Sequence, residues 1–155
     1  MEREIIRVKI GEVKVGHRTQ LLKTTLGSCI GISIYDTVKK KCALAHCLLP
    51  ESDENLGIGA RYVNQAIESL FALMKVRDRD QKEFIISYAG GANMMSQIQL
   101  ESSNKIGNKN LDAIRSILKK YKFKVRELDC GDTFGRQMSI DCTDGKVIVS
   151  RLLNG

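Results

Sequence analysis

Two short apolar runs decide the fold of this sequence: residues 29–35 (CIGISIY) and residues 42–49 (CALAHCLL). The polar segment 36–41 (DTVKKK) separates them. Apolar runs of this length, interrupted by a polar turn, are typical of two antiparallel strands joined as a hairpin. Pro50 ends the second run, because proline lacks the N–H group that a strand ladder needs.

The segments on either side of this hairpin predict a mixed α and β fold. Residues 5–15 alternate apolar and charged, which indicates one or two short strands broken near Gly11. Apolar residues at helical spacing predict helices over 59–76 and about 108–121. Further strands are expected at 83–89, 123–129, 137–142 and 146–152, the last two joined by a D-G turn. Consecutive hairpins favour antiparallel pairing, so we expect an α+β fold with largely antiparallel sheets and at least two helices.

The composition predicts one soluble domain. The chain has 155 residues, of which 43% are hydrophobic and 28% charged, an ordinary globular mixture. We therefore expect a single domain over residues 1–155. No apolar run approaches the roughly 18–20 residues of a membrane span, and the first residues lack the apolar stretch of a signal peptide. Five cysteines, none of them in a C-x-x-C pair, argue against a complete disulfide framework and favour a reducing cytoplasm.

A cysteine lies at the start of the first hairpin strand, in the sequence Gly27-Ser28-Cys29. Glycine gives the backbone freedom on one side of this cysteine, and the strand gives rigidity on the other. This combination favours a nucleophile that faces a substrate while nearby N–H groups point to the same spot. A buried structural thiol is the alternative, because free cysteine is among the most buried residue types.

His46 is the candidate base for this thiol. A cysteine with an ordinary pKa of about 8.5 is mostly protonated at neutral pH and needs a base beside it. If the hairpin turn is centred between residues 37 and 39, opposed residue numbers add to about 75–77. Cys29 and His46 then face each other directly or lie diagonally on one face, whereas a slip of one residue separates them. The alternative is an interior histidine that is hydrogen-bonded to a backbone carbonyl.

Other residues carry weaker signals. Gly90 and Gly91 follow an expected strand, which indicates either a tight turn or a wall of the site. A zinc site at Cys42, His46 and Cys47 is not expected, because Cys47 would point away from the other two. We expect free thiols at the four remaining cysteines, which are Cys42, Cys47, Cys130 and Cys142.

Basic residues are concentrated in the segment 105–126. It contains eight Lys and Arg residues and one acid, Asp112, so its excess equals the net charge of +7 of the whole chain. Such a segment typically complements a helix dipole and keeps a protein soluble. It also suits the recruitment of an acidic partner. Nucleic acid is a distant alternative, because few aromatic residues are present for stacking and no recognition motif occurs.

Five motifs occur in order between residues 7 and 151. They are 26–29 (LGSC), 43–50 (ALAHCLLP), 89–94 (AGGANM), 106–110 (IGNKN) and 129–136 (DCGDTFGR). Together they resemble the CheD family of chemoreceptor glutamine deamidases. The resemblance implies a mixed α/β sandwich of the cytotoxic-necrotizing-factor deamidase type.

The resemblance also implies the chemistry. It assigns the nucleophile to Cys29 and its histidine to His46, with no metal or organic cofactor. The implied substrates are methyl-accepting chemotaxis receptors, whose glutamines become glutamates, and the implied regulatory partner is the phosphatase CheC. Membrane insertion and nucleic-acid binding are not expected.

The family's third catalytic residue is a threonine five or six positions before the cysteine. Thr24 lies five positions before Cys29, while Lys23 lies six before, so we assign Thr24, with Thr25 as the alternative. We place the oxyanion or substrate contacts at Gly27, Ser28, Gly90 and Gly91. In the late motif, Asp132 and Thr133 replace the usual Gly-Asn. The altered threonine spacing and late motif leave a competing interpretation, a non-catalytic adaptor that binds the receptor or CheC.

Overall fold

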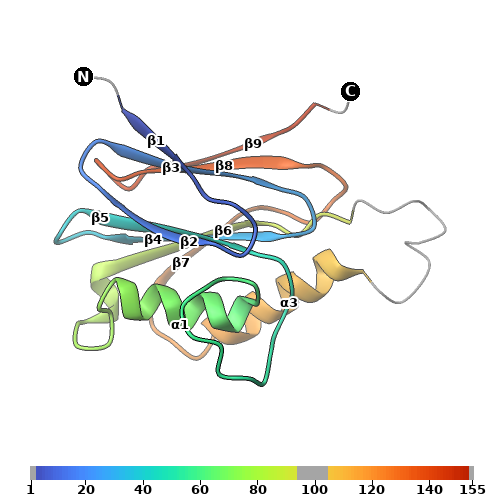
Figure 1. The fold of residues 1–155 in the computed structure, drawn as a ribbon, viewed down its shortest axis with the longest axis horizontal. Helices are drawn as coiled ribbons and strands as arrows, with labels where there is room; N and C mark the ends of the chain where they lie inside the picture. Colours follow the sequence, from blue (N-terminus) through green and yellow to red (C-terminus); the bar gives the residue numbers. More distant parts are fainter. Residues whose placement is uncertain (1–2, 94–104, 154–155) are drawn as a thin grey trace.

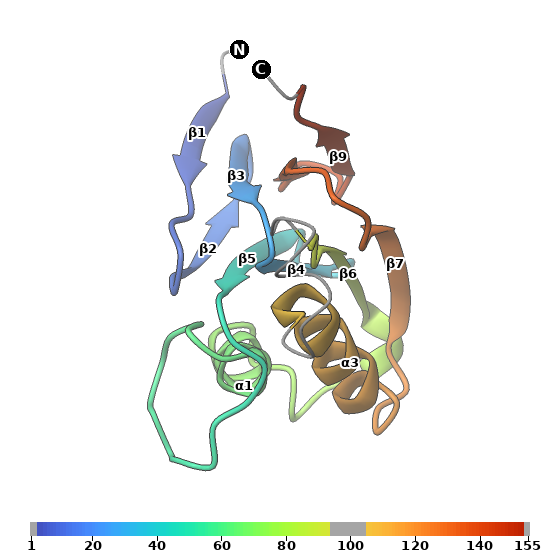
Figure 2. The same ribbon diagram turned by 90° about the vertical axis from the view of Figure 1, so that its right-hand side faces the viewer.

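The described part of the chain folds into two β-sheets that face each other, with two α-helices on the outer side of one sheet (Figures 1 and 2). A computed structural model describes residues 3–93 and 105–153. One sheet has the order β1 (Glu4–Arg7), β3 (Gln20–Leu26), β8 (Arg136–Asp141), β9 (Val147–Arg151). The other has the order β2 (Val13–His17), β5 (Lys41–Cys47), β4 (Ile30–Asp36), β6 (Phe84–Gly90), β7 (Lys124–Cys130). The helices are α1 (Val63–Leu73), α3 (Ile106–Leu118) and the short 3₁₀ turn η1 (Gln81–Glu83).

The predicted α+β class is confirmed, and the pairing is mostly antiparallel. Two pairs, β1 with β3 and β6 with β7, are parallel. The predicted helices begin and end a few residues from their expected bounds, and α1 starts only at Val63. Within the described residues, no helix combines the length and the apolar character needed to cross a membrane.

The predicted hairpin is confirmed as β4 and β5, with Ile30 opposite Cys47 and Asp36 opposite Lys41. Every residue of β4 is buried, because the strand pairs on both sides and both faces of its sheet are covered. This double coverage explains why both strands are continuous apolar runs without alternation.

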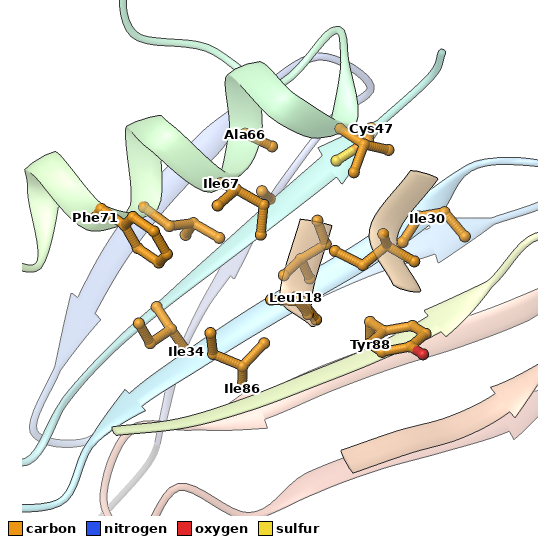
Figure 3. Close-up of a cluster of buried hydrophobic side chains, with 14 of the residues drawn as sticks. Ile30, Ile34, Cys47, Ala66, Ile67, Phe71, Ile86, Tyr88 and Leu118 are labelled. Carbon is orange, nitrogen blue, oxygen red and sulfur yellow. The ribbon is translucent and has the colours of Figure 1, made fainter. Parts of the chain in front are cut away.

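The helices cover one face of the five-stranded sheet. Ile67 and Phe71 of α1 and Leu118 of α3 pack with Ile34 and Cys47 of the hairpin in one buried cluster (Figure 3). These helices bury their apolar stripes here, as their predicted spacing requires. A layer of apolar side chains thus separates the helices from the sheet.

A second buried cluster fills the space between the two sheets. Leu22, Leu26, Leu44 and Met138 are fully buried there. The strand β3, which supplies two of these leucines, is absent from the sequence prediction. Two adjacent leucines, Leu21 and Leu22, interrupt the apolar–polar alternation that would predict a strand. The strand is recognised only from its place in the second sheet.

The prediction of free thiols is wrong for two of the cysteines. Cys42 of β5 and Cys142, just after β8, form a disulfide between the two sheets, with their Cα atoms 5.4 Å apart. Cys29, Cys47 and Cys130 are free, as predicted. An odd cysteine count rules out only complete pairing, and residues 100 positions apart meet here because the sheets stack.

Candidate active site

Thr24 and His46 form a buried polar pair that joins the two sheets. Thr24 lies on β3 and His46 on β5, and both side chains are nearly inaccessible to solvent. The Thr24 Oγ1 atom lies 2.6 Å from His46 Nδ1 and 2.7 Å from the carbonyl oxygen of Val8. Thr25 is exposed on the opposite face of β3. The structure therefore brings Thr24, and not Thr25, to His46.

These contacts decide which nitrogen of His46 carries the proton. A carbonyl oxygen only accepts, so the single hydroxyl proton of Thr24 is donated to Val8. The Oγ1 atom must then accept from His46, which places the imidazole proton on Nδ1. The other nitrogen, Nε2, is buried and has no hydrogen-bond partner among residues 3–93 and 105–153. His46 thus presents an unprotonated Nε2 with a free lone pair.

Cys29 lies on the same face of the hairpin as His46. The observed register places Gly31 opposite His46, so Cys29, two residues earlier, is the diagonal neighbour of the histidine. Diagonal neighbours in an antiparallel pair lie about 7 Å apart, within reach of aromatic and long side chains. The cysteine packs in the cluster between the sheets and is 6% exposed. Of the geometries that the sequence allowed, the structure shows the diagonal one.

Burial keeps both groups of this pair neutral. Desolvation lowers the pKa of His46 to about 4, so the imidazole is uncharged at neutral pH. Desolvation also raises the pKa of the Cys29 thiol. Cys29 is therefore a neutral thiol and His46 a neutral imidazole in the folded protein at neutral pH.

The loop that carries Cys29 is anchored through its carbonyl groups. The Gly91 N–H donates to the Cys29 carbonyl at 2.9 Å, and the Ala92 N–H donates to the Gly27 carbonyl at 3.1 Å. Gly90 has φ of 109°, and a Cβ atom there would lie 2.3 Å from the Cys29 oxygen, so only glycine fits. The predicted role of Gly90 and Gly91 in lining the site stays a prediction. Their observed contacts hold the loop that carries Cys29 in place.

The late motif 129–136 holds the two sheets together beside this loop. Arg136 of β8 is fully buried and donates to Asp129 at the end of β7 and to the Gly90 carbonyl. Arg151 also pairs with Asp129 at 2.8 Å, and these two cations lower the pKa of that carboxyl. Asp132, which replaces a usual residue of the family, has φ of 60° and accepts a hydrogen bond from the Asn93 N–H. Met94 of the motif 89–94 lies outside the described residues.

A cleft of about 450 Å³ opens beside the buried pair. Its lining includes Thr24 and His46 and three basic residues, Arg7, Lys9 and Lys23. None of these three cations forms an ion pair within the described part of the chain. The Cys29 side chain is not part of the lining, so the cleft adjoins the threonine–histidine side of the site.

The remaining chemical candidates lie apart from this site. Cys47 faces the helix cluster, on the side of β5 opposite His46. In the described ranges, no group of three His, Cys, Asp or Glu side chains is arranged to hold a metal ion. The basic segment 105–126 runs along α3 and into β7. Within it Arg115 pairs with Glu127, whereas Lys119, Lys120 and Lys122 are exposed.

Two contributors to the site were given no role of their own by the sequence analysis. Val8 supplies the carbonyl that fixes the Thr24 hydroxyl. Asn110 of α3 is fully buried, and its side-chain amide donates to the Ser28 and Leu48 carbonyls. Asn110 ends the IGNKN motif, and a buried asparagine within an apolar helix face is the signal that points to it.

Comparisons with known proteins find one matching family and several similar full-length proteins. The family described as "CheD chemotactic sensory transduction" matches residues 48–151. A "Probable chemoreceptor glutamine deamidase CheD" from Archaeoglobus fulgidus is 33% identical, covering 93% of this chain and 91% of the relative. A protein of the same description from Methanococcus vannielii is 35% identical, covering 95% of each chain. "Probable chemoreceptor glutamine deamidase CheD 2" from Ruegeria sp. is 30% identical over 95% of this chain and 92% of the relative.

Proposed function

Because the chain belongs to the CheD family, we propose that it hydrolyses the side-chain amide of selected glutamines in chemotaxis receptors. The observation that carries this proposal is the Thr24–His46 pair. It leaves the unprotonated Nε2 of a neutral imidazole on the face that also bears Cys29. A thiol next to such a base is the arrangement that nucleophilic cysteine catalysis requires.

The first half of the reaction forms a thioester. As the sulfur of Cys29 bonds to the carboxamide carbon, its proton passes to His46 Nε2. The carbonyl oxygen becomes an oxyanion, and in this proposal backbone N–H groups around Ser28 and Cys29 stabilise it. His46 then returns the proton to the departing nitrogen, and the C–N bond breaks to release ammonia.

The second half restores the enzyme. His46 removes a proton from water, the hydroxide bonds to the thioester carbon, and the carbon–sulfur bond breaks. The products are a glutamate side chain and the Cys29 thiol. Thr24 acts through His46, because its hydroxyl accepts the Nδ1 proton and so keeps Nε2 available for proton transfer.

The cleft beside the site suits an acidic substrate. Arg7, Lys9 and Lys23 line it, and no ion pair within the described part of the chain neutralises them. We expect carboxylates flanking the target glutamine to bind there. This proposal includes two partners, which are the cytoplasmic signalling region of a receptor and a CheC-type regulator.

The test is mass spectrometry of a receptor cytoplasmic domain incubated with the protein. Each deamidation replaces –NH₂ by –OH and adds about 1 Da, with one ammonia released per event. Peptide mapping locates the converted glutamines. Tight receptor binding without a mass change or ammonia would contradict the proposal and support the non-catalytic adaptor.

A further inference from the structure

The backbone of the nucleophile loop is anchored on one side only. The carbonyls of Gly27, Ser28 and Cys29 all accept hydrogen bonds, from Ala92, Asn110 and Gly91 respectively. By contrast, the N–H groups of these three residues have no acceptor among residues 3–93 and 105–153. The loop therefore holds its carbonyls fixed and leaves its donors free.

Asn110 controls the central peptide of this loop. Its Nδ2 atom lies 3.0 Å from the Ser28 carbonyl oxygen and 3.1 Å from the Leu48 carbonyl oxygen. The same amide thus joins the nucleophile loop to the chain just after His46. The side chain is fully buried, and its Oδ1 atom has no partner in the described residues, so this amide acts only as a donor here.

The orientation of the Ser28 carbonyl dictates that of the next N–H group. In a planar trans peptide the C=O and the N–H point in opposite directions. Since Asn110 draws the Ser28 oxygen toward α3, the Cys29 N–H points away from α3. That donor belongs to the candidate nucleophile itself and has no acceptor among the described residues, so it is available to the oxygen of a carbonyl that the sulfur attacks.

We propose that Asn110 is a positioning residue that aims the Cys29 N–H at the oxyanion, acting through the Ser28 carbonyl. This inference rests on the proposed deamidase function. Without the hydrogen bond from Asn110, the Ser28–Cys29 peptide is free to rotate, and the Cys29 N–H loses its fixed direction. A preorganised donor stabilises the transition state more than the ground state, so the loss falls on kcat.

The main experiment compares Asn110→Ala and Asn110→Ser with the control Asn108→Ala. Asn108 lies on the same helix but is exposed, and within the described residues its side chain forms one hydrogen bond, accepted from the Asn93 side chain. We expect Asn110→Ala to lower kcat by about 10- to 100-fold with KM within about threefold. Asn110→Ser keeps one donor, so its kcat is expected to lie between that of Asn110→Ala and that of the wild type. The control is expected to match the wild type.

Two further measurements separate positioning from a general structural defect. Alkylation of Cys29 by iodoacetamide forms no oxyanion, so its rate in Asn110→Ala is expected to stay within about twofold of wild type. A substrate peptide with an aldehyde in place of the carboxamide adds to the Cys29 thiol and places its oxygen at the oxyanion position. In Asn110→Ala the affinity for this aldehyde peptide is expected to fall by the same factor as kcat.

The outcomes distinguish this inference from the proposed function. Unchanged kcat in Asn110→Ala, or an alkylation rate that falls as far as kcat, would overturn the positioning role. If the Asn110 variants do not fold, the wild-type Cys29 amide proton provides the test by NMR: it is expected to move downfield when the aldehyde binds, and an unmoved signal overturns the inference. A wild type that converts no glutamine would instead refute the deamidase function.

Discussion

Cys29 and Cys47 sit at the same end of one hairpin, and their surroundings differ in almost every respect. Cys47 pairs with Ile30, the neighbour of Cys29, yet it points toward the helices and lies among apolar side chains (Figure 3). Burial raises its thiol pKa far above the usual range. Cys29 points toward the other sheet, where Thr24 and His46 form the buried polar pair.

This difference shows that the face of the sheet, rather than burial, separates a structural thiol from a candidate nucleophile. On the helix-facing side, Cys47 lies within a large cluster of apolar side chains. The layer between the sheets is mostly apolar, but it also contains the threonine, the histidine and the buried Arg136. Two of these polar contacts join the sheets, Thr24 with His46 and Arg136 with Asp129.

Replacing each thiol gives the largest contrast. Cys29→Ala is expected to lower deamidation by at least about 10³-fold while the protein stays folded, because the bond to the substrate carbon is lost. Cys47→Ala is expected to keep kcat within about threefold and to cost about 1 kcal/mol of stability from lost packing. Ammonia release and thermal unfolding measure both. Near-normal turnover in Cys29→Ala would contradict the assignment of the nucleophile.

Removing the base sharpens the comparison. His46→Ala is expected to lower kcat by about 10²- to 10⁴-fold and to slow iodoacetamide labelling of Cys29, since the thiol loses its proton acceptor. Labelling of Cys47 and Cys130 is expected to be unaffected. His17→Ala, at an exposed position on β2, is the control. Peptide-resolved alkylation kinetics give the answer, and equal labelling of Cys29 in both variants would exclude an activated pair.

The polar pair also makes stability depend on pH. The pKa of His46 is about 4 in the folded protein, against 6.5 for an ordinary histidine, so between these values the unfolded state binds the extra proton. Stability is therefore fully present above pH 6.5 and falls by up to about 3 kcal/mol as the pH drops toward 4. Denaturant unfolding from pH 7.5 to 4.5 is expected to show this loss in wild type and not in His46→Gln. Parallel pH curves would refute it.

Thr24 is expected to have a smaller effect than His46. Thr24→Val keeps the shape but removes the hydroxyl, which leaves the His46 Nδ1–H and the Val8 carbonyl without partners. We expect kcat to fall about 10- to 100-fold and stability to fall by about 1–3 kcal/mol. Thr24→Ser is expected to restore most of both. If Thr25→Val shows the larger loss of kcat, the assignment to Thr24 is wrong.

The basic segment 105–126 on the helix side should give the smallest effect. Reversing Lys119, Lys120 and Lys122 to Glu is expected to lower kcat/KM about threefold at low salt and to leave kcat unchanged, because the patch aids encounter. The difference in kcat/KM between this variant and the wild type should disappear near 0.5 M salt, where the Debye length is about 4 Å. Parallel salt series for the two proteins would exclude steering, and a fall in kcat would connect the patch to the site.

Local patterns in the sequence are enough to locate the hairpin and the candidate pair. The two apolar runs on either side of 36–41 match β4 and β5, because a fully buried strand has to be apolar on both faces. The Gly-Ser-Cys sequence and the two-residue periodicity of a strand limit Cys29 and His46 to a few relative positions. The observed diagonal register is one of them. The resemblance to CheD then selects these residues from the other cysteines and histidines.

The late motif shows that local sequence patterns do not predict tertiary contacts. Residues 129–136 match a family segment, but nothing in their spacing shows that Arg136 becomes fully buried or that Asp129 takes two arginines. The Cys42–Cys142 disulfide is a similar case, and the prediction of free thiols failed there. Both features depend on which strands from distant parts of the chain come to face each other.

The sequence by itself determines the two helices and most of the strands, because these follow from side-chain periodicity within short segments, and its resemblance to CheD singles out Cys29 and His46 as the candidate pair. Tertiary structure alone decides that Thr24 meets His46, that the Val8 carbonyl settles the imidazole tautomer, and that Asn110 holds the Ser28 carbonyl. The physical reason is that a single hydrogen bond depends on positions to within a few tenths of an ångström. Those positions are set by how two sheets and a helix pack, to which every buried side chain contributes.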